Sequence, residues 1–287
     1  MKTYLDCIPC FIKQSLEATR MVTVDKTVHA QVMKEVLKYL QTLSFDTPPP
    51  VTSKKVHAIV RKITKCDDPY KTVKDQSNIM AEKLYPQLKE MIHTSNDSLL
   101  TAIKFAIVGN AIDFGSVMRF NVKTMINDSL KKRIINTAYP RFKKVLTNAK
   151  NILYLADNAG EIFFDKLLLE ELATRNTEIT YAVKANPILN DATFTDAKKA
   201  GIESVAKVIS ADADQDESSP GILLKTVSKE FLEHFNQDDL VIAKGQGNYE
   251  SLNEVKREIF FLLLVKCPLV AQDMDTKMGD LIFRVQK

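Results

Sequence analysis

The sequence predicts an α/β protein in which an N-terminal helical bundle precedes a three-layer α/β/α domain with a mostly parallel sheet. Residues 1–150 show apolar positions at helical spacing, whereas residues 151–287 alternate short apolar strands with helical segments. This alternation is typical of a parallel sheet that is covered by helices on both faces. We therefore expect a helical domain over 1–150 and a Rossmann-like α/β/α domain over 151–287.

The helical half is predicted from apolar periodicity and from turn residues. Three consecutive prolines in Phe45–Val51 predict a loop, after which Thr52 and Ser53 are expected to cap the next helix. Pro140 suits the first turn of the last helix. The expected helices are Cys7–Ala18, Val28–Leu43, Lys54–Ile63, Lys74–Ile92, Ser98–Ile112 and Pro140–Asn148.

The second half is predicted from short apolar runs that are separated by polar or helical segments. Asp280–Val285 is expected to add an edge strand, and the charged stretch Asp212–Ser219 is expected to be a solvated loop. The expected strands of the parallel sheet are Ile152–Ala156, Ile179–Val183, Val205–Ile209, Leu240–Ala243 and Ile259–Val265.

Composition places the chain among ordinary globular proteins. Of its 287 residues, 45% are hydrophobic and 26% are charged, and the net charge of +4 is a mild excess. We find no basic stripe with stacking aromatic residues, and the longest apolar run, Ile259–Val265, is far too short to span a bilayer. The N-terminus also lacks the apolar core of a signal peptide. We therefore expect a cytoplasmic protein that binds neither nucleic acid nor membrane, with its oligomeric state open.

The stretch Asn151–Glu161 contains the first candidate site. Its strand ends on Asp157 and Asn158, and Gly160 allows a tight turn into the next helix. Ligands of open α/β sheets bind beyond the carboxyl ends of the strands, and hard oxygen donors there suit Mg²⁺ or a similar divalent cation. Alternatively, Asn158 caps the helix and Asp157 complements its dipole. This stretch alone leaves both interpretations open.

Polar residues also follow the other predicted strands. Because parallel strands end on one edge of the sheet, these residues are expected to converge on a site for a divalent cation and an anionic substrate. They are Lys184, Asn186 and Asp191 after the second strand, Lys244 to Asn248 with Glu250 after the fourth, and Lys266 with Cys267 after the fifth. Gly245 and Gly247 further allow backbone amides beside Lys244 to turn toward a phosphate.

The helical half offers two further candidates. Asn110 and Asp113 share one face of the most apolar helix, which indicates either a site or a helix end that Asn110 caps. Cys7 and Cys10 have the spacing of a metal or redox pair, although a zinc site needs about four ligands. We expect these two cysteines to be structural, with a zinc site that includes Cys66 as the alternative and Cys267 as the only other thiol able to complete one.

Four motifs together resemble the metal-dependent damage-control phosphatase family, long catalogued as a domain of unknown function. Cys7-x-x-Cys10 and Asp68-Pro69-Tyr70 are similar to its archaeal and bacterial subgroup. The four motifs are Gly109-Asn110-Ala111-Ile112-Asp113, Asp157-Asn158-Ala159-Gly160-Glu161, Lys184-Ala185-Asn186-Pro187 with Asp191, and Lys244-Gly245-Gln246-Gly247-Asn248-Tyr249-Glu250.

The resemblance implies a fold, a cofactor and a substrate class. It implies a helical domain followed by an α/β/α domain, with metal ligands at Asp157, Asn158 and Asp191. Lys244 most resembles the family's phosphate-contacting lysine. Members of the family hydrolyse small phosphorylated metabolites, such as sugar phosphates, with Mg²⁺, Mn²⁺, Co²⁺ or Ni²⁺.

We therefore expect a metal-dependent phosphatase. Asn110 and Asp113 would close the site, and the base for water would be Asp113 or Glu161 unless Asp157 attacks directly. The expected phosphate-binding residues are Lys244, Gly245, Gly247, Asn248, Lys184 and Asn186. The alternatives are an S-adenosylmethionine-dependent carboxyl methyltransferase, which would favour a more glycine-rich first loop, and a non-catalytic metabolite-binding protein.

Overall fold

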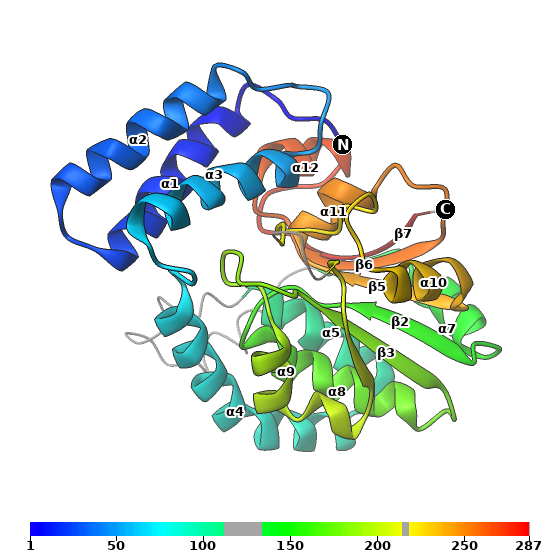
Figure 1. Ribbon diagram of the computed structural model, residues 1–287. Helices are drawn as coiled ribbons and strands as arrows, with labels where there is room; N and C mark the ends of the chain where they lie inside the picture. The colour runs from blue at the N-terminus through cyan, green and yellow to red at the C-terminus, as the bar shows by residue number, and fades with distance from the viewer. Residues whose placement is uncertain (112–133, 214–217, 287) are drawn as a thin grey trace.

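A computed structural model describes residues 1–111, 134–213 and 218–286, which contain one seven-stranded sheet with helices on both faces (Figure 1). The strand order is β1-β7-β6-β5-β2-β3-β4, and all neighbouring strands are parallel except β6 and β7. The predicted fold class is thereby confirmed. The strands are β1 (Ile134–Asn136), β2 (Asn151–Leu155), β3 (Glu178–Val183), β4 (Lys207–Ser210), β5 (Leu240–Lys244), β6 (Ile259–Leu264) and β7 (Leu281–Gln286).

Strand β2 lies near the centre of the sheet and is buried on both faces. Ile152 and Tyr154 belong to one hydrophobic cluster, whereas Leu153 and Leu155 belong to the cluster on the opposite face. Successive side chains of a strand point to opposite faces, so a strand covered on both sides must be apolar at every position. This burial explains the continuous apolar run before Asp157.

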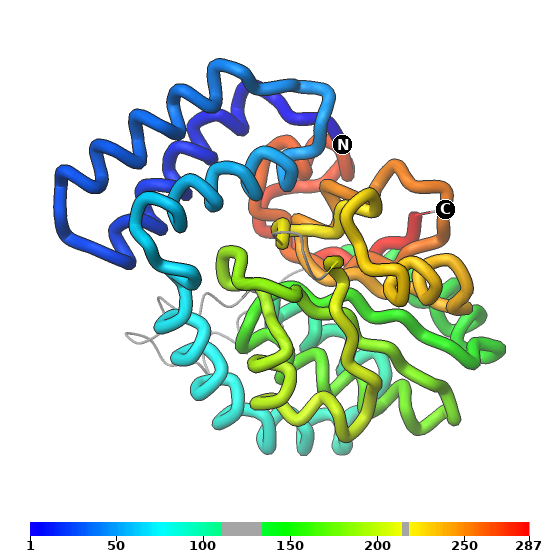
Figure 2. Tube along the Cα trace, in the orientation of Figure 1, coloured from blue at the N-terminus to red at the C-terminus, as the bar shows by residue number. Residues whose placement is uncertain are grey.

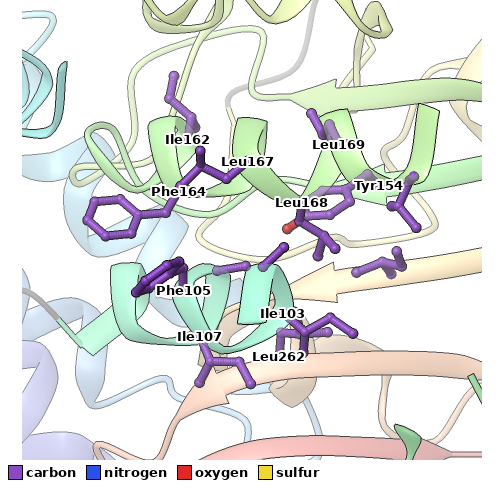
Figure 3. Close-up of a cluster of buried hydrophobic side chains, with 14 of the residues drawn as sticks. Ile103, Phe105, Ile107, Tyr154, Ile162, Phe164, Leu167, Leu168, Leu169 and Leu262 are labelled. Carbon is purple, nitrogen blue, oxygen red and sulfur yellow. The ribbon is translucent and has the colours of Figure 1, made fainter. Parts of the chain in front are cut away.

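The first helical layer is built on α5 (Ser98–Ala111) and α8 (Glu161–Ala173), which pack directly on each other. Figure 3 shows Phe105 of α5 facing Phe164 of α8, with Leu262 of the sheet on the other side of α5. Both helices are apolar around most of their circumference, as expected of helices buried between other elements. Within the described residues, this layer also contains α4 (Lys71–His93), α7 (Tyr139–Leu146) and α9 (Phe194–Ala200), with a 3₁₀ turn at Ile202–Ser204.

The opposite face of the sheet is covered by shorter helices. Phe231 and Phe235 of α10 stack on each other, with ring centroids 5.9 Å apart, and both are buried in the second hydrophobic cluster. Tyr249 of α11 packs edge-on against Phe261 of β6 in the same cluster. These helices are α10 (Lys229–Gln237), α11 (Gln246–Leu252) and α12 (Pro268–Asp273).

Helices α1 (Cys7–Val22), α2 (Lys26–Leu40) and α3 (Pro49–Thr64) form a separate small bundle with its own core. Figures 1 and 2 show this bundle as the blue to cyan part of the chain, standing away from the layer formed by α5 and α8. Helix α3 contacts α11, which brings the bundle to the edge where β2 and β5 end. The bundle therefore covers the edge of the sheet at which we expected the site.

Several local predictions need correction. Helix α3 begins at Pro49 and Pro50 rather than at Lys54, because prolines fit the first helical turn, where no intrahelical N–H bond is lost. Strand β7 is not an edge strand: it lies between β6 and the unexpected strand β1. The packing also crosses residue 150, because α5 and α7 share a hydrophobic cluster with β2. The division into two domains at residue 150 stays a prediction.

Candidate active site

The loops after β2 and β3 are held together by backbone hydrogen bonds. The Ala159 N–H donates to the Asn190 carbonyl at 2.9 Å, and the Ala192 N–H donates to the Asp157 carbonyl at 2.8 Å. An isolated antiparallel bridge joins Asn158 and Asp191 between them. This pairing brings the three predicted metal ligands to one place, although Asp191 comes from a different loop from the other two.

Asp157, Asn158 and Asp191 line a cavity of about 340 Å³ between the sheet and the small helical bundle. Strands β2 and β5 are neighbours in the sheet, and the chain leaves them toward opposite sides, β3 on one and β6 on the other. Such a switch point is where open α/β sheets bind ligands. The other walls come from α1, α3, α11 and the loops after β3, β4 and β6, and include Phe11, Gln14, Ser53, Leu189, Gly247 and Lys266.

Asp157 is held by two side-chain amides. The Nδ2 atoms of Asn110 and Asn158 each donate to Asp157 Oδ2 at 2.7 Å. Within the part of the chain that the structure describes, these bonds reach only Oδ2, so Oδ1 is the oxygen left for a ligand. Burial raises the pKa of Asp157 to about 7, and the nearby Glu161 carboxylate adds to this effect.

Asp191 is buried in the same cavity with little compensation for its charge. Burial raises its pKa well above the usual range, against the effect of Lys184, whose Nζ lies 3.9 Å from the carboxylate. Asp157 raises the pKa of Asp191 further, because the two negative charges repel. The carboxylates of Asp157 and Asp191 repel each other across one cavity, and a bound cation would offset this repulsion.

The donor set fits a hard divalent cation in its chemistry. In residues 1–111, 134–213 and 218–286, no three Cys, His, Asp or Glu side chains form a metal-binding group. The third donor of the predicted set would therefore be the side-chain oxygen of Asn158, whose Nδ2 already donates to Asp157 and Glu161. Two carboxylates and one carboxamide oxygen are the donor types that Mg²⁺ and Mn²⁺ favour.

Lys244 does not line the cavity, and its predicted contact with phosphate stays a prediction that this position does not support. Its side chain is fully buried, and Nζ donates to Glu161 and, at 2.6 Å, to Asp165. Burial alone would lower the pKa of Lys244, but Asp165 and Glu161 outweigh this effect and raise it to about 12. The hydroxyls of Tyr154 and Tyr181 also donate to Asp165, at 2.8 Å each.

Both carboxylate oxygens of Glu161 accept hydrogen bonds from protein side chains, which argues against its predicted role as a base. Its side chain is only 1% exposed, and Lys244 donates to Oε1. The amides of Asn110 and Asn158 donate to Oε2 at 3.0 Å each. Asn110 thus bridges Asp157 and Glu161, and its predicted role in closing the site stays a prediction. Asp113, the other predicted base, lies outside the described residues.

Of the other residues that were predicted to bind phosphate, only Gly247 lines the cavity. Lys184 is buried and donates to the Gly221 carbonyl at 3.0 Å. Asn186 is exposed outside the cavity. Asn248 is buried and donates to the carbonyls of Ala156 at 3.1 Å and Lys244 at 2.8 Å. It therefore ties the ends of β2 and β5 together rather than facing a substrate.

Gly245 lies directly against Asp157. Its φ is +81°, a conformation that side chains rarely adopt, and an added Cβ would overlap the Asp157 carboxylate. The predicted glycine thus permits a close approach of the chain to the candidate metal ligand.

Lys266 lines the cavity, and it was expected to converge on the site, although it was not among the expected phosphate-binding residues. It follows β6, its side chain is exposed, and its positive charge lowers the pKa of Asp157.

Asn78 of α4 gave no sequence signal at all. Its Oδ1 accepts the Gly160 N–H at 2.7 Å, and its Nδ2 donates to Asp196 at 2.8 Å. Asn78 therefore clamps the loop that carries Asp157.

The stretch Asp212–Ser219 is not simply the solvated loop that we expected. Asp212 is 3% exposed, and its carboxylate accepts the Ala185 N–H at 3.2 Å and the Ser218 hydroxyl at 2.7 Å. These bonds support the loop after β3. Residues 214–217 lie outside the described part of the chain.

The damage-control phosphatase ARMT1-like domain matches residues 3–282 of this chain. The chain belongs to this family. Damage-control phosphatase PH1575 of Pyrococcus horikoshii is 36% identical over 98% of this chain and 97% of its own length. The damage-control phosphatase of Archaeoglobus fulgidus is 32% identical over 97% of each chain.

Structural comparison agrees with this membership. The crystal structure of a DUF89 family protein, PH1575 from Pyrococcus horikoshii, superposes with a TM-score of 0.92 at 34% identity and covers 100% of both chains. The assignment to the Cys-x-x-Cys subgroup stays a prediction. In the part of the chain that the structure describes, no helix has the length and apolar character needed to cross a membrane.

Proposed function

We propose that this chain is a metal-dependent phosphatase that hydrolyses a phosphomonoester of a small metabolite, such as a sugar phosphate. The observation that carries the proposal is the convergence of Asp157, Asn158 and Asp191 on one cavity at the switch point of the sheet. The phosphatase names of the relatives from Pyrococcus horikoshii and Archaeoglobus fulgidus support the reaction class.

The cofactor is proposed from the donor set. Asp157, Asn158 and Asp191 would hold Mg²⁺, Mn²⁺, Co²⁺ or Ni²⁺, and such an ion, when bound, supplies Lewis-acid polarisation of a phosphoryl oxygen. Asn110 keeps Asp157 in place through Oδ2, so Oδ1 is the oxygen left for the ion. The raised pKa of Asp157 means that protons compete with a cation for this carboxylate below about pH 7.

The described residues limit which carboxylate can act as the nucleophile or as the general base. Both oxygens of Glu161 are occupied by Lys244 and by the two asparagine amides. Asp6, Asp157, Asp191 and Glu250 all line the cavity, and among them we propose Asp157, the residue already predicted to attack the phosphorus directly. A pKa near the working pH suits a general base.

Lys266 takes the role in phosphate binding that we first assigned to Lys244. Its side chain lines the cavity close enough to Asp157 to influence that carboxylate's pKa. The loop at Gly247 forms the adjoining wall. A lysine placed beside a transferring phosphoryl group stabilises its negative charge.

Phosphate release from a panel of sugar phosphates, measured with and without Mn²⁺, tests the proposal. Asp157→Asn and Asp191→Ala should each lose activity by about 100-fold or more and should also lose the Mn²⁺-dependent rise in melting temperature. Asp46→Asn is the matched control, because Asp46 is exposed and pairs only with the exposed Lys2.

Two results would contradict the proposal. Wild-type phosphate release by Asp157→Asn would remove this carboxylate from the mechanism. A melting-temperature rise with S-adenosylmethionine, without any response to divalent ions, would favour the methyltransferase alternative.

A further inference from the structure

Three cysteines line the same cavity as the candidate metal ligands. Cys7 and Cys10 belong to the first turn of α1, and Cys267 is the residue immediately before α12 begins. All are free thiols, as is Cys66, which follows α3 and does not line the cavity. The fold therefore brings Cys267, and not Cys66, to the N-terminal pair.

The three cavity thiols differ in their surroundings. Cys7 is buried, and its sulfur accepts the Tyr4 N–H at 3.4 Å. Cys10 is exposed, and its sulfur has only a weak contact with Gln14 Nε2 at 3.5 Å. Burial of the sulfur raises the pKa of the Cys10 thiol, and Cys267 is the next largest influence on it. Cys10 is the exposed residue among the three, and Cys267 lines the same cavity.

The two thiols belong to separately packed parts of the molecule. Helix α1 contributes to the core of the small helical bundle, whereas Cys267 packs against the cluster beneath α10 to α12. The cavity lies between these two parts. A covalent bond from Cys10 to Cys267 would therefore join its opposite walls.

The geometry favours a thiol pair over a thiolate metal centre. Across the described ranges, no three Cys, His, Asp or Glu side chains form a metal-binding group. The three cavity cysteines therefore form no such group, either alone or together with Glu250, which also lines the cavity. A disulfide needs only two thiols, whose Cα atoms must come within about 7 Å, and Cys10 and Cys267 line one cavity.

We propose that Cys10 and Cys267 form a reversible disulfide across the cavity in response to hydrogen peroxide, and that this bond closes the site. The Cys10 thiolate attacks peroxide, so the O–O bond breaks, sulfenic acid forms and hydroxide leaves. The Cys267 thiolate then attacks the sulfenic sulfur; the S–S bond forms, the S–O bond breaks, and hydroxide takes a proton to give water. A dithiol reverses the reaction.

The bond would act on the site through the neighbour of Cys267. Lys266 precedes Cys267 in the chain, and its N–H donates to Gln246 Oε1 at 3.0 Å beside the cavity. Tethering Cys267 to α1 fixes this segment and obstructs the space between Cys10 and the carboxylates. The expected loss of phosphatase activity rests on the proposed function, whereas the formation of the disulfide does not depend on it.

The test treats the full-length protein with hydrogen peroxide, alkylates the remaining thiols and maps the disulfides by mass spectrometry under non-reducing conditions. Phosphate release with Mn²⁺ is measured before oxidation, after it and after dithiothreitol. Each protein is compared with its own reduced form. The proteins are wild type, Cys10→Ser, Cys267→Ser and the matched control Cys66→Ser.

We expect a peptide linked through Cys10 and Cys267 in wild type and in Cys66→Ser, with an at least tenfold loss of activity that dithiothreitol restores. Cys10→Ser and Cys267→Ser should keep their own reduced activity under the same treatment. A disulfide between Cys7 and Cys10 alone, or stoichiometric zinc held by the thiols, would overturn the proposal. A linked peptide in a protein that releases no phosphate even when reduced would support the disulfide and overturn the proposed function.

Discussion

Lys244 and Lys266 end neighbouring strands, yet their side chains have opposite surroundings. Lys244 is fully buried between Glu161 and Asp165, whereas Lys266 is exposed in the cavity. A buried ammonium with two carboxylate partners is part of the architecture beneath the site. An exposed ammonium beside Asp157 is available to an anionic substrate.

Replacing each lysine by methionine should separate these roles. Lys244→Met leaves two buried carboxylates without their cation, so we expect the free energy of unfolding to fall by about 3–5 kcal/mol. Lys266→Met should change stability by less than about 0.5 kcal/mol and raise KM about tenfold or more, because a charge-assisted contact is lost. Urea unfolding and steady-state phosphate release measure both. Normal kinetics in Lys266→Met would place the phosphate elsewhere.

Glu250 provides a test of pH dependence. Burial raises its pKa to about 7 in the folded protein, against a usual value near 4.5. A carboxyl with a raised folded pKa binds more protons when folded, so its contribution to stability is lost as the pH rises from about 4.5 to 7. Relative to Glu250→Gln, metal-free wild type should lose on the order of 1–3 kcal/mol across this range. Parallel stability curves for the two proteins in urea would refute this expectation.

At the scale of elements, the site depends on two loops that are each fixed by a neighbour. The loop after β2 is clamped by Asn78 of α4 and pairs with the loop after β3. The turn after β5 passes so close to Asp157 that only glycine fits at Gly245. The carboxylate is thus positioned by the backbones of three strand ends and by one helix outside the sheet.

Gly245→Ala should displace Asp157 and weaken Mn²⁺ binding. Both Gly245 and Gly279 have positive φ, +81° and +88°, so alanine at either position costs about 1–2 kcal/mol of backbone strain. A Cβ at Gly279 meets nothing within 4 Å, which makes Gly279→Ala the matched control. Only Gly245→Ala should lose the Mn²⁺-dependent rise in melting temperature. An equal loss in both variants would show that general destabilisation is the cause.

At the scale of the whole molecule, the cavity lies between a large body and a small bundle. The sheet buries extensive clusters on both faces, whereas α1 to α3 share only a small core. Because few buried contacts hold the bundle, it should open at a lower free energy than the sheet. Opening of the bundle would expose the cavity.

Val60→Ala tests this difference. Val60 is fully buried in the bundle, and its truncation should cost about 1–3 kcal/mol. Hydrogen exchange followed by mass spectrometry should show faster exchange in α1 to α3, with β2 and β5 unchanged. Leu168→Ala, in the core of α8, is the counterpart and should accelerate exchange in the sheet as well. Equal acceleration everywhere in Val60→Ala would mean that the molecule opens as one unit.

The sequence by itself determined the strand and helix types and the location of the site. Continuous apolar runs such as β2, with polar residues at their ends, reflect local periodicity and burial, which a linear pattern records. Asp157, Asn158 and Asp191 were therefore placed among the polar residues that follow strands, whereas their choice as one ligand set came from the family resemblance. Their role as metal ligands stays a prediction, as does the function of the N-terminal cysteines.

Only the tertiary structure decided which polar residues face the cavity. Lys244 and Lys266 both follow apolar strands, and no local pattern says which one meets Asp165 of α8. The short strand β1, the clamp at Asn78 and the placement of Cys10 and Cys267 on one cavity likewise depend on contacts between segments far apart in the chain. Such contacts are set by how layers pack, and packing is a property of the whole fold rather than of any stretch of sequence.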